Sequence, residues 1–253
     1  MPKDLSKPFI QRLYDSKTLE EKFSVLEHEM LLSGFDGALY TFIPKLSRLK
    51  ETLQPVFQFS ESYAEIVENY QKNNFDKNDF TIRLIVGGKL SIIDWWIEAN
   101  KIPLNEEEEN VVNITKNKFG VTKGITFPTL SNDMGIAGVS IISFKSEYAN
   151  KQLDSKTSEY LKSCCRMYHD HTMVHQDSRY EFILPILKTL TPKKKIVLKY
   201  LISGRAMKNI AEESNITTRY AEKLLVELRN EFGGISKNEL IYYLGLLNIT
   251  EYL

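Results

Sequence analysis

Basic side chains gather toward the end of this 253-residue chain. Between residues 190 and 238, ten Lys and Arg stand against five Glu, a net charge of +5 in a chain whose formal net charge is zero. Residues 1–175 hold 21 basic and 24 acidic side chains, a net charge of −3. Because phosphate contacts supply most non-specific affinity for DNA, this asymmetry favours a DNA-binding unit joined to a sensing unit. The alternative is a small helical bundle with ordinary solvated lysines.

Cap and stop residues predict the four short helices that position these charges. Thr191 caps the first helix, with Pro192 at its first position, and a capping box opens the fourth. The helices are predicted from 191 to the stop at Gly204, over 207–214, from the cap at Thr217 to about 232, and from Ser236 onward. A short helix, a tight turn and a longer helix form a helix-turn-helix, whose second helix enters the DNA major groove.

The third of these helices carries most of the candidate DNA contacts. Arg219 lies in its first turn and Lys223 follows four residues later on the same face. The candidate contact residues are Arg219, Lys223, Arg229, Thr218 and Lys208. Glu222 and Glu227 on this helix would repel phosphates, so either they point away from the groove or DNA binding is weak.

The region before residue 176 alternates helical and strand patterns. Thr18 opens a capping box, and Asn105 and Asp154 are further helix caps. Helices are predicted at 18–34, 61–73, after 105 and over 154–175, and strands at 38–43, 123–128 and 137–144. The predicted fold class is α+β: an N-terminal α/β/α sandwich with a central antiparallel sheet around one cavity, followed by an all-α helix-turn-helix domain.

The C-terminal segment resembles the LuxR/NarL-type helix-turn-helix family. The matching residues are Leu190-Thr191-Pro192, Val197-Leu198, Gly204, Ile210-Ala211 and Ile216. This sequence departs from the family's pattern at three places. Lys194 stands where the family usually has an acidic residue, Tyr220-Ala221-Glu222 replaces Thr-Val-Lys, and Leu224 replaces a histidine.

The N-terminal region resembles the autoinducer-binding domain of the LuxR family, so the resemblance spans nearly the whole chain. The matching positions are Gly34-Phe35-Asp36, Tyr70 with Asp79 nine residues later, Asp94-Trp95-Trp96, Gly124–Pro128 and Ser140. The resemblance implies a pocket for an acyl-homoserine lactone, in which a carboxylate accepts the ligand's amide N–H and a tryptophan donates to the lactone carbonyl.

Asp79 is the candidate carboxylate of this pocket, because an ionised carboxylate only accepts hydrogen bonds. Burial without a partner would be costly, so a ligand or a tyrosine must satisfy it. The alternative is an exposed loop position. The other candidate ligand-binding residues are Tyr63, Ile66, Tyr70, Trp95, Trp96 and Ser140, with core packing as the alternative for the aromatic ones. Trp95 and Trp96 are adjacent, so on a strand they would face opposite ways, with one lining the pocket and the other packing outside.

Two departures bear on ligand choice. The resemblance places the lactone-binding tryptophan at Ile66, which donates no hydrogen bond, and Phe80 replaces the proline that follows the carboxylate. A hydrogen-bond donor lost from a built site changes ligand choice steeply. The expected ligand is a small amphiphilic signal, either an acyl-homoserine lactone or, as these departures favour, a different molecule; the alternative is no ligand.

Composition bounds the remaining classes of protein. No apolar run approaches a membrane span and the first residues lack the core of a signal peptide, so a cytoplasmic protein is expected. Cys164 and Cys165 are adjacent and predict no disulfide framework. The histidines at 169, 171 and 175 are not expected to share one metal-binding face, and no motif of an enzyme or of a cofactor site is present. We expect no enzyme, no metal and no cofactor.

The expected organisation is a ligand-sensing domain over 1–175, a linker over 176–189 and a DNA-binding domain over 190–253. The predicted function is a ligand-responsive transcription regulator whose homodimer presents two recognition helices to a two-fold DNA site. The alternative is a regulator that has lost DNA binding and acts by protein contact as an anti-activator, with Glu222, Leu224 and Lys194 as its supporting features.

Overall fold

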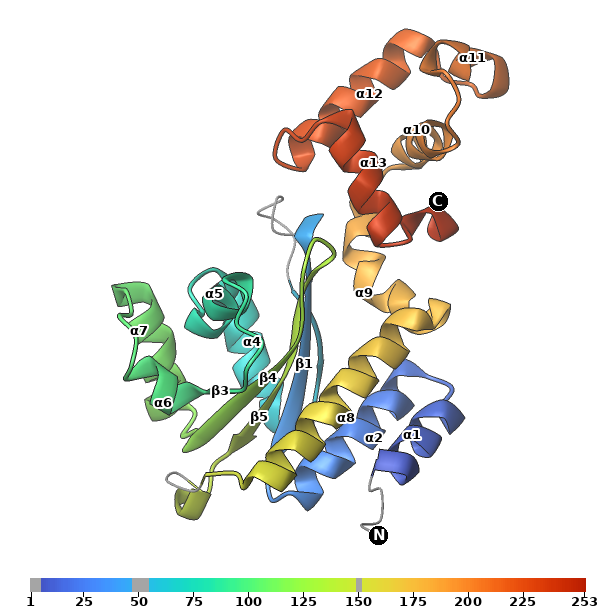
Figure 1. Ribbon diagram of the computed structural model, residues 1–253. Coiled ribbons are helices and arrows are strands. Elements are labelled where there is room, and N and C mark those ends of the chain that lie inside the picture. Colours follow the sequence, from blue (N-terminus) through green and yellow to red (C-terminus); the bar gives the residue numbers. More distant parts are fainter. Residues whose placement is uncertain (1–5, 47–54, 149–151) are drawn as a thin grey trace. The chain divides into compact units, whose positions relative to one another are not determined.

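The computed structural model describes residues 6–46, 55–148 and 152–253, and the chain forms two compact units (Figure 1). One unit is built from most of the first 179 residues and the other chiefly from Tyr180–Leu253. No helix in the described part of the chain is long and apolar enough to cross a membrane.

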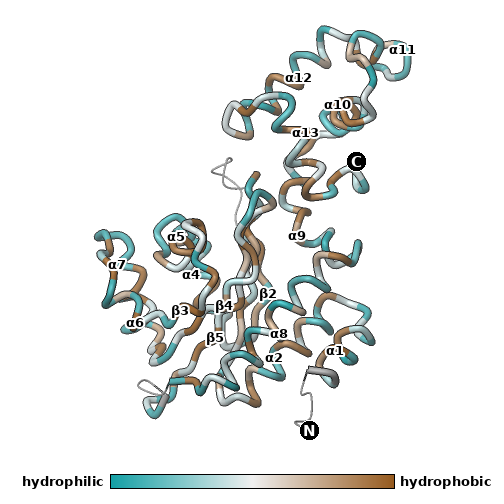
Figure 2. The backbone as a smooth tube through the Cα atoms, in the orientation of Figure 1, coloured by the Kyte–Doolittle hydropathy of each residue, from teal (hydrophilic) through white to brown (hydrophobic). Residues whose placement is uncertain are grey.

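A five-stranded sheet in the order β2-β1-β5-β4-β3 is the centre of the first unit. Its strands are β1 (Gly37–Pro44), β2 (Val56–Phe59), β3 (Ile93–Asp94), β4 (Lys123–Ser131) and β5 (Gly135–Ser143). The pairs β1–β2, β3–β4 and β4–β5 are antiparallel. A β-bulge between Pro128 and Leu130 shifts the register of β4, where proline cannot donate to the ladder. In Figure 2 the strands are mostly white to brown, as expected for a sheet that helices cover.

Helices cover both faces of this sheet (Figure 1). On one side lie α1 (Ser6–Asp15), α2 (Leu19–Leu32) and α8 (Ser155–Val174). On the other lie η1 (Glu61–Tyr63), α4 (Ala64–Lys72), η2 (Phe75–Lys77), α5 (Phe80–Val86), α6 (Trp95–Ala99), α7 (Glu106–Asn113) and η3 (Ile114–Lys118). A short η4 (Ser146–Tyr148) follows β5. The α/β/α sandwich predicted from the sequence is confirmed.

The two faces of the sheet are packed to different degrees. Tyr40 and Phe42 of β1 are completely buried, and Tyr40 contacts Tyr168 and His169 of α8. Leu39 and Thr41 alternate with them on the opposite face and are only half-buried. The α8 side is therefore a closed core, whereas the α4 and α6 side retains accessible apolar surface.

The second unit is helical throughout its C-terminal part. Its helices are α9 (Gln176–Lys188, which begins in the first unit), α10 (Pro192–Ile202), η5 (Met207–Asn209), α11 (Ile210–Glu213), α12 (Thr218–Glu231), α13 (Lys237–Leu246) and η6 (Ile249–Tyr252). The segment 176–189, expected as a linker, is thus occupied by α9. The caps expected at Thr191, Thr217 and Ser236 are all formed.

The structure also contains elements that the sequence patterns did not reveal. Helix α1 and strands β2 and β3 were not predicted, since the two strands have four and two residues and carry no long alternation. In α11, Ile210 is buried as expected, but Ala211 is exposed. The four-residue α11 is too short to bury both side chains.

Candidate ligand-binding and DNA-binding sites

An apolar cluster on the half-packed face of the sheet brings together most of the predicted ligand-binding residues. Tyr63, Val67, Val121 and Ile142 are its buried members. Packed against them, and only partly buried, are Leu39, Phe57, Ile66, Trp95, Trp96 and Phe119. We call these ten residues the aromatic cluster. Its partly buried apolar side chains form a surface that an apolar ligand group can cover.

Tyr70 and Asp79 lie at the polar edge of this region and bind each other. The Tyr70 hydroxyl donates to Asp79 Oδ2 at 2.9 Å. Asp79 caps α5 and accepts the backbone N–H of Thr81 at 2.8 Å and its hydroxyl at 2.7 Å. Burial raises the pKa of Asp79, partly opposed by these hydrogen bonds from Thr81 and Tyr70. A tyrosine therefore satisfies the carboxylate, and the alternative of an exposed loop residue is wrong, since Asp79 is partly buried.

Trp95 and Trp96 do not lie on a strand, so the expectation that they face opposite ways is wrong. Strand β3 ends at Asp94, whose side chain caps α6, and both tryptophans lie in the first turn of that helix. Their rings meet edge to face with centroids 5.9 Å apart, and both pack against the aromatic cluster. The Asp94 carboxylate explains the difference, because it accepts the Ile97 N–H and starts a helix there.

The Trp95 indole is held by Thr126, which lies in the matched segment Gly124–Pro128 but was not among the predicted site residues. Trp95 Nε1 donates to Thr126 Oγ1 at 2.7 Å, and Thr126 Oγ1 lies 2.8 Å from Ser140 Oγ. Thr126 and Ser140 are cross-strand partners in β4 and β5, so their side chains share a face. A Cβ at Gly124 would lie 2.0 Å from Trp95 Cε3, so only glycine lets the ring lie against the strand. The predicted Ser140 therefore contacts the indole network through Thr126.

The Tyr63 hydroxyl is a buried polar group that has no hydrogen-bond partner among the described residues. The whole side chain is 0% exposed in the aromatic cluster. Burial also raises the pKa of Tyr63 well above its usual value, so the hydroxyl stays protonated and can donate. An unpaired buried hydroxyl costs about 1–3 kcal/mol, which a ligand acceptor would recover.

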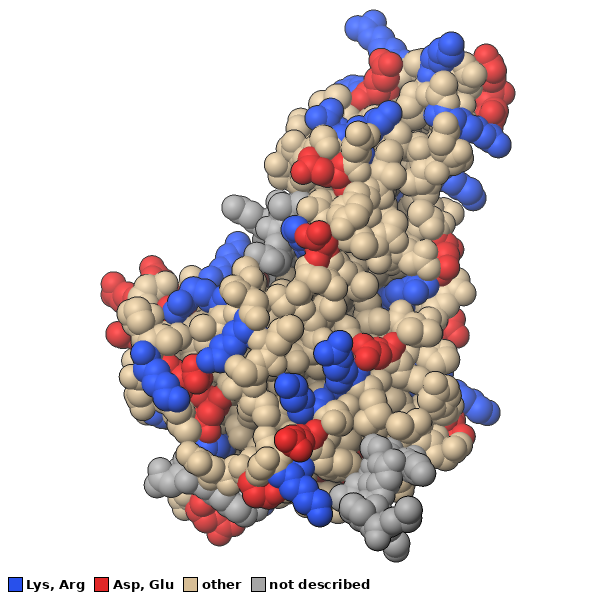
Figure 3. Space-filling view, viewed as in Figure 1, with Lys and Arg blue, Asp and Glu red and all other residues tan. Residues whose placement is uncertain are grey.

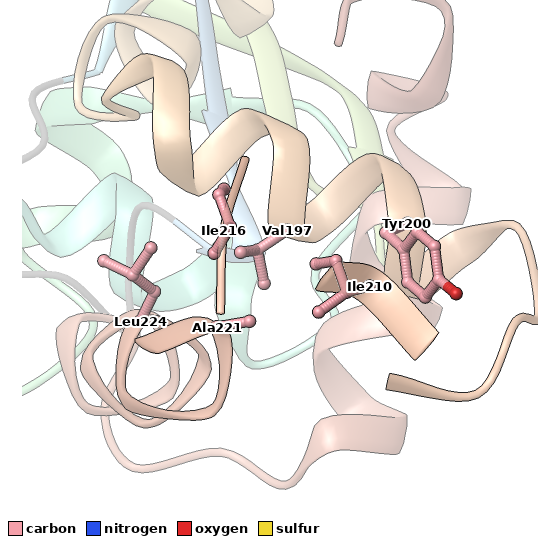
Figure 4. Packing of buried hydrophobic residues seen from close by; sticks show 6 residues of the cluster. All are labelled: Val197, Tyr200, Ile210, Ile216, Ala221 and Leu224. Carbon is pink, nitrogen blue, oxygen red and sulfur yellow. The ribbon is translucent and has the colours of Figure 1, made fainter. Parts of the chain in front are cut away.

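The C-terminal helices have their own small core. Val197 and Tyr200 of α10, Ile210 of α11, Ile216, and Ala221 and Leu224 of α12 form one hydrophobic cluster, drawn as sticks in Figure 4. Leu224 is 4% exposed in this core. Leucine at this position therefore packs the domain together instead of facing a DNA groove.

The buried residues of α12 define its outward face. Ala221, Leu224 and Leu228 point inward, and at 3.6 residues per turn the opposite side carries Arg219, Lys223, Val226 and Asn230. All four are exposed. Glu222 lies on one flank of this stripe, and Glu227 on the other flank pairs with Lys223 at 3.7 Å. The two predicted contact residues Arg219 and Lys223 therefore share one face.

Other basic residues of this unit are engaged within it. Lys194 is buried and forms an ion pair with Glu231 at the end of α12, so it is not a solvated lysine. Arg229 is half-buried and its Nε donates to the Ile235 carbonyl at 2.7 Å. Thr218 donates to the Lys208 carbonyl at 3.1 Å, which joins the start of α12 to η5, while the Lys208 side chain remains exposed. In the view of Figure 3, basic and acidic side chains are interspersed over this unit.

Comparisons with known proteins give the relationship of this chain. A family model described as autoinducer binding domain matches residues 18–171. The crystal structure of Escherichia coli SdiA is 14% identical with a TM-score of 0.53, over 96% of this chain and 97% of that chain. SdiA in complex with octanoyl-rac-glycerol is 13% identical with a TM-score of 0.54, over 96% of this chain and 94% of that chain.

A third solved structure is less similar. CepR2 from Burkholderia cenocepacia, described as an N-acylhomoserine lactone dependent LuxR family transcription factor, is 15% identical with a TM-score of 0.45, over 67% of this chain and 92% of that chain. A search of curated proteins found no match. The family model covers more than half of the chain, and the two SdiA structures share its fold along almost the whole length. The chain therefore belongs to the autoinducer-binding domain family.

Proposed function

We propose that this protein is a transcription regulator that binds a small amphiphilic signal in the aromatic cluster and DNA through α12, acting as a homodimer. The observation that carries the ligand half of this proposal is the Tyr63 hydroxyl, which is fully buried and unpaired among half-buried apolar side chains. A ligand with an acyl chain would cover these side chains, and a polar acceptor on the ligand would receive the Tyr63 proton.

The chemistry of the cluster supports a head group other than a homoserine lactone. Ile66 packs against the cluster without any hydrogen-bond donor, and Trp95 Nε1 already donates to Thr126. Asp79 already accepts from Tyr70 and Thr81. The polar groups available to a ligand are thus hydroxyls, which suit an ester or hydroxyl head group. A solved structure of SdiA, which shares the fold, is described as a complex with such a molecule, octanoyl-rac-glycerol.

The ligand proposal is tested by denaturing the purified full-length protein and identifying bound small molecules by mass spectrometry. The extract of a Tyr63→Trp variant, in which a larger ring fills the cluster, is the matched control. We expect an acylated molecule without a lactone ring from the wild type and little of it from the variant. Equal recovery from both proteins would place the ligand elsewhere and contradict the proposal.

The DNA-binding half rests on the exposed Arg219–Lys223 face of α12. Of the three features that favour an anti-activator, Leu224 packs in the domain core and Lys194 is paired with Glu231. Glu222 alone remains at the exposed flank, and it weakens phosphate attraction without blocking the groove-facing stripe. Binding to DNA is therefore favoured over binding to another regulator.

Titration of fluorescent duplex DNA by anisotropy over a salt series tests this half. Arg219→Ala and Lys223→Ala should each weaken binding and reduce the salt slope by about 1, because each removes one phosphate contact. Lys199→Ala, which removes an exposed lysine from α10, is the control and should change neither. Glu222→Lys should strengthen non-specific binding. No wild-type affinity at low salt would instead support the protein-contact role.

A further inference from the structure

A pair of histidines at the end of α8 lies outside both sites described above. His171 is half-buried in the last turn of α8, and His175 is the exposed C-cap residue of that helix. Their Nε2 atoms are 3.0 Å apart and their ring centroids 4.2 Å apart. From their spacing in the sequence, the histidines at 169, 171 and 175 are not expected to share one face. Spacing of four residues puts two of them on one face, while His169 turns inward to Tyr40.

We propose that His171 and His175 form a chelating site for a divalent transition-metal ion that prefers imidazole ligands, such as Cu²⁺, Ni²⁺ or Zn²⁺. The Nε2 separation is the first reason. Metal–nitrogen bonds of about 2.0 Å put two ligands about 2.8 Å apart at a right angle and about 3.3 Å apart in a tetrahedron. The observed Nε2–Nε2 distance of 3.0 Å lies between these values, so small rotations of the rings are sufficient for an ion to bind. The distance is closer to the right-angle value, which favours tetragonal Cu²⁺.

The surroundings leave room for the remaining ligands. A groove of about 300 Å³ between α1 and α8 is lined by both histidines, Tyr14 and Asp170. The part of the chain that the structure describes holds no cluster of three or more His, Cys, Asp or Glu suited to a metal. Water therefore completes the coordination shell, and Asp170, whose side chain is 62% exposed, adds negative charge beside it.

The charges around the pair permit a cation. Burial chiefly lowers the pKa of His171 to about 4, with His175 and Lys22 adding to the effect. The Lys22 ammonium donates to Ser178 Oγ at 2.6 Å. The negative charge of Asp177 partly offsets its positive charge. The Arg166 guanidinium lies 3.8 Å from Asp170. Where a ring donates its Nε2 proton in the free protein, that proton moves to Nδ1 when the metal binds.

Metal binding would stabilise the last turn of α8. A chelate between positions four apart joins consecutive turns, and Gln176, the first residue of α9, follows directly. Bound metal would therefore oppose fraying of the last turn of α8 before its C-cap residue His175. This role is independent of the ligand and DNA sites, so its failure leaves the proposed function standing.

The test is a titration of the tag-free, full-length protein with Cu²⁺ and separately with Zn²⁺, followed by isothermal calorimetry. Two imidazoles on one turn act as a bivalent ligand, so His175→Ala should weaken Cu²⁺ binding on the order of 100-fold. His28→Ala is the matched control, because His28 is an exposed histidine on α2, in the same unit. It should leave the affinity unchanged, and chelator should reverse wild-type binding.

Electron paramagnetic resonance of the Cu²⁺ form gives a second readout. We expect hyperfine structure from two nitrogen ligands in the wild type and in His28→Ala, and its loss in His175→Ala. Circular dichroism without metal should show that His175→Ala folds normally, since His175 is exposed. Equal Cu²⁺ affinity in wild type and His175→Ala, or a wild-type spectrum without two nitrogens, would overturn the proposal and leave a plain histidine–histidine hydrogen bond.

Discussion

Replacing Tyr63 by phenylalanine should make the ligand-free protein more stable. The hydroxyl is buried without a partner, a state that costs about 1–3 kcal/mol. Its removal leaves a void of roughly 10 Å³, which costs only about 0.2 kcal/mol. The free energy of unfolding of the ligand-free N-terminal unit should therefore rise by about 1–2 kcal/mol. Few substitutions in a protein core increase the free energy of unfolding, so an increase would be specific evidence for the unpaired hydroxyl.

The same substitution should weaken ligand binding, because the ligand no longer gains the hydrogen bond. A loss of about 1–2 kcal/mol corresponds to roughly 5–30-fold in Kd. Octanoyl-rac-glycerol is a suitable probe. Tyr63→Phe should thus raise the stability of the ligand-free protein and reduce the extra stability that the ligand gives. A general packing defect would instead lower the stability in both states.

Tyr70→Phe is the matched control, since it removes a tyrosine hydroxyl that does have a partner. That hydroxyl donates to the Asp79 carboxylate at 2.9 Å, and such a bond is worth about 1.5–3 kcal/mol. Tyr70→Phe should therefore destabilise the ligand-free protein.

Urea unfolding followed by tryptophan fluorescence is the assay for both variants. The chain has two tryptophans, and both pack against the aromatic cluster, so the signal reports on this unit. If Tyr63→Phe destabilises the protein as much as Tyr70→Phe does, the Tyr63 hydroxyl has a partner and the reasoning fails.

Two further predictions concern the same unit. Gly124→Ala should displace the Trp95 ring, break its bond to Thr126 and destabilise the unit by about 1–3 kcal/mol, because the new Cβ would lie 2.0 Å from Trp95 Cε3. Tryptophan emission and melting check this, with Gly87→Ala, where contacts are no closer than 3.4 Å, as control. Burial alone would raise the pKa of Glu108, but Arg83 and the Asn105 N–H hold it below the usual 4.5. This stabilisation is present above pH 4.5 and is lost as the pH falls through the lowered pKa. In Glu108→Gln, the free energy of unfolding should therefore fall less steeply as the pH is lowered. Glu107→Gln, at an exposed position, is the control and should keep the wild-type pH dependence. An unchanged pH profile would show that the Arg83–Glu108 pair adds no net stability.

Local signals in the sequence were sufficient for the elements that have strong caps. Thr18, Asn105, Asp154, Thr191, Thr217 and Ser236 each begin a helix where predicted, because a side-chain oxygen satisfies a backbone N–H within three residues. The same locality explains why β2 and β3 were missed. Short strands depend on partners that lie far away in sequence, and Ile93 pairs with Thr126.

Which side chains meet was decided by the tertiary structure. The spacing of Tyr70 and Asp79 suggested a site, but their hydrogen bond spans a helix and a loop that only packing brings together. Trp95 lies in a helix and not in a strand, because the Asp94 side chain accepts the Ile97 N–H and caps α6. Leu224 and Lys194, which are departures from a family pattern in the sequence, lie inside the C-terminal unit, where packing with Ile216 and pairing with Glu231 account for them. The sequence by itself determined the local elements and the types of residue available. Burial determined which polar groups remained unpaired, because desolvation depends on neighbours from the whole fold.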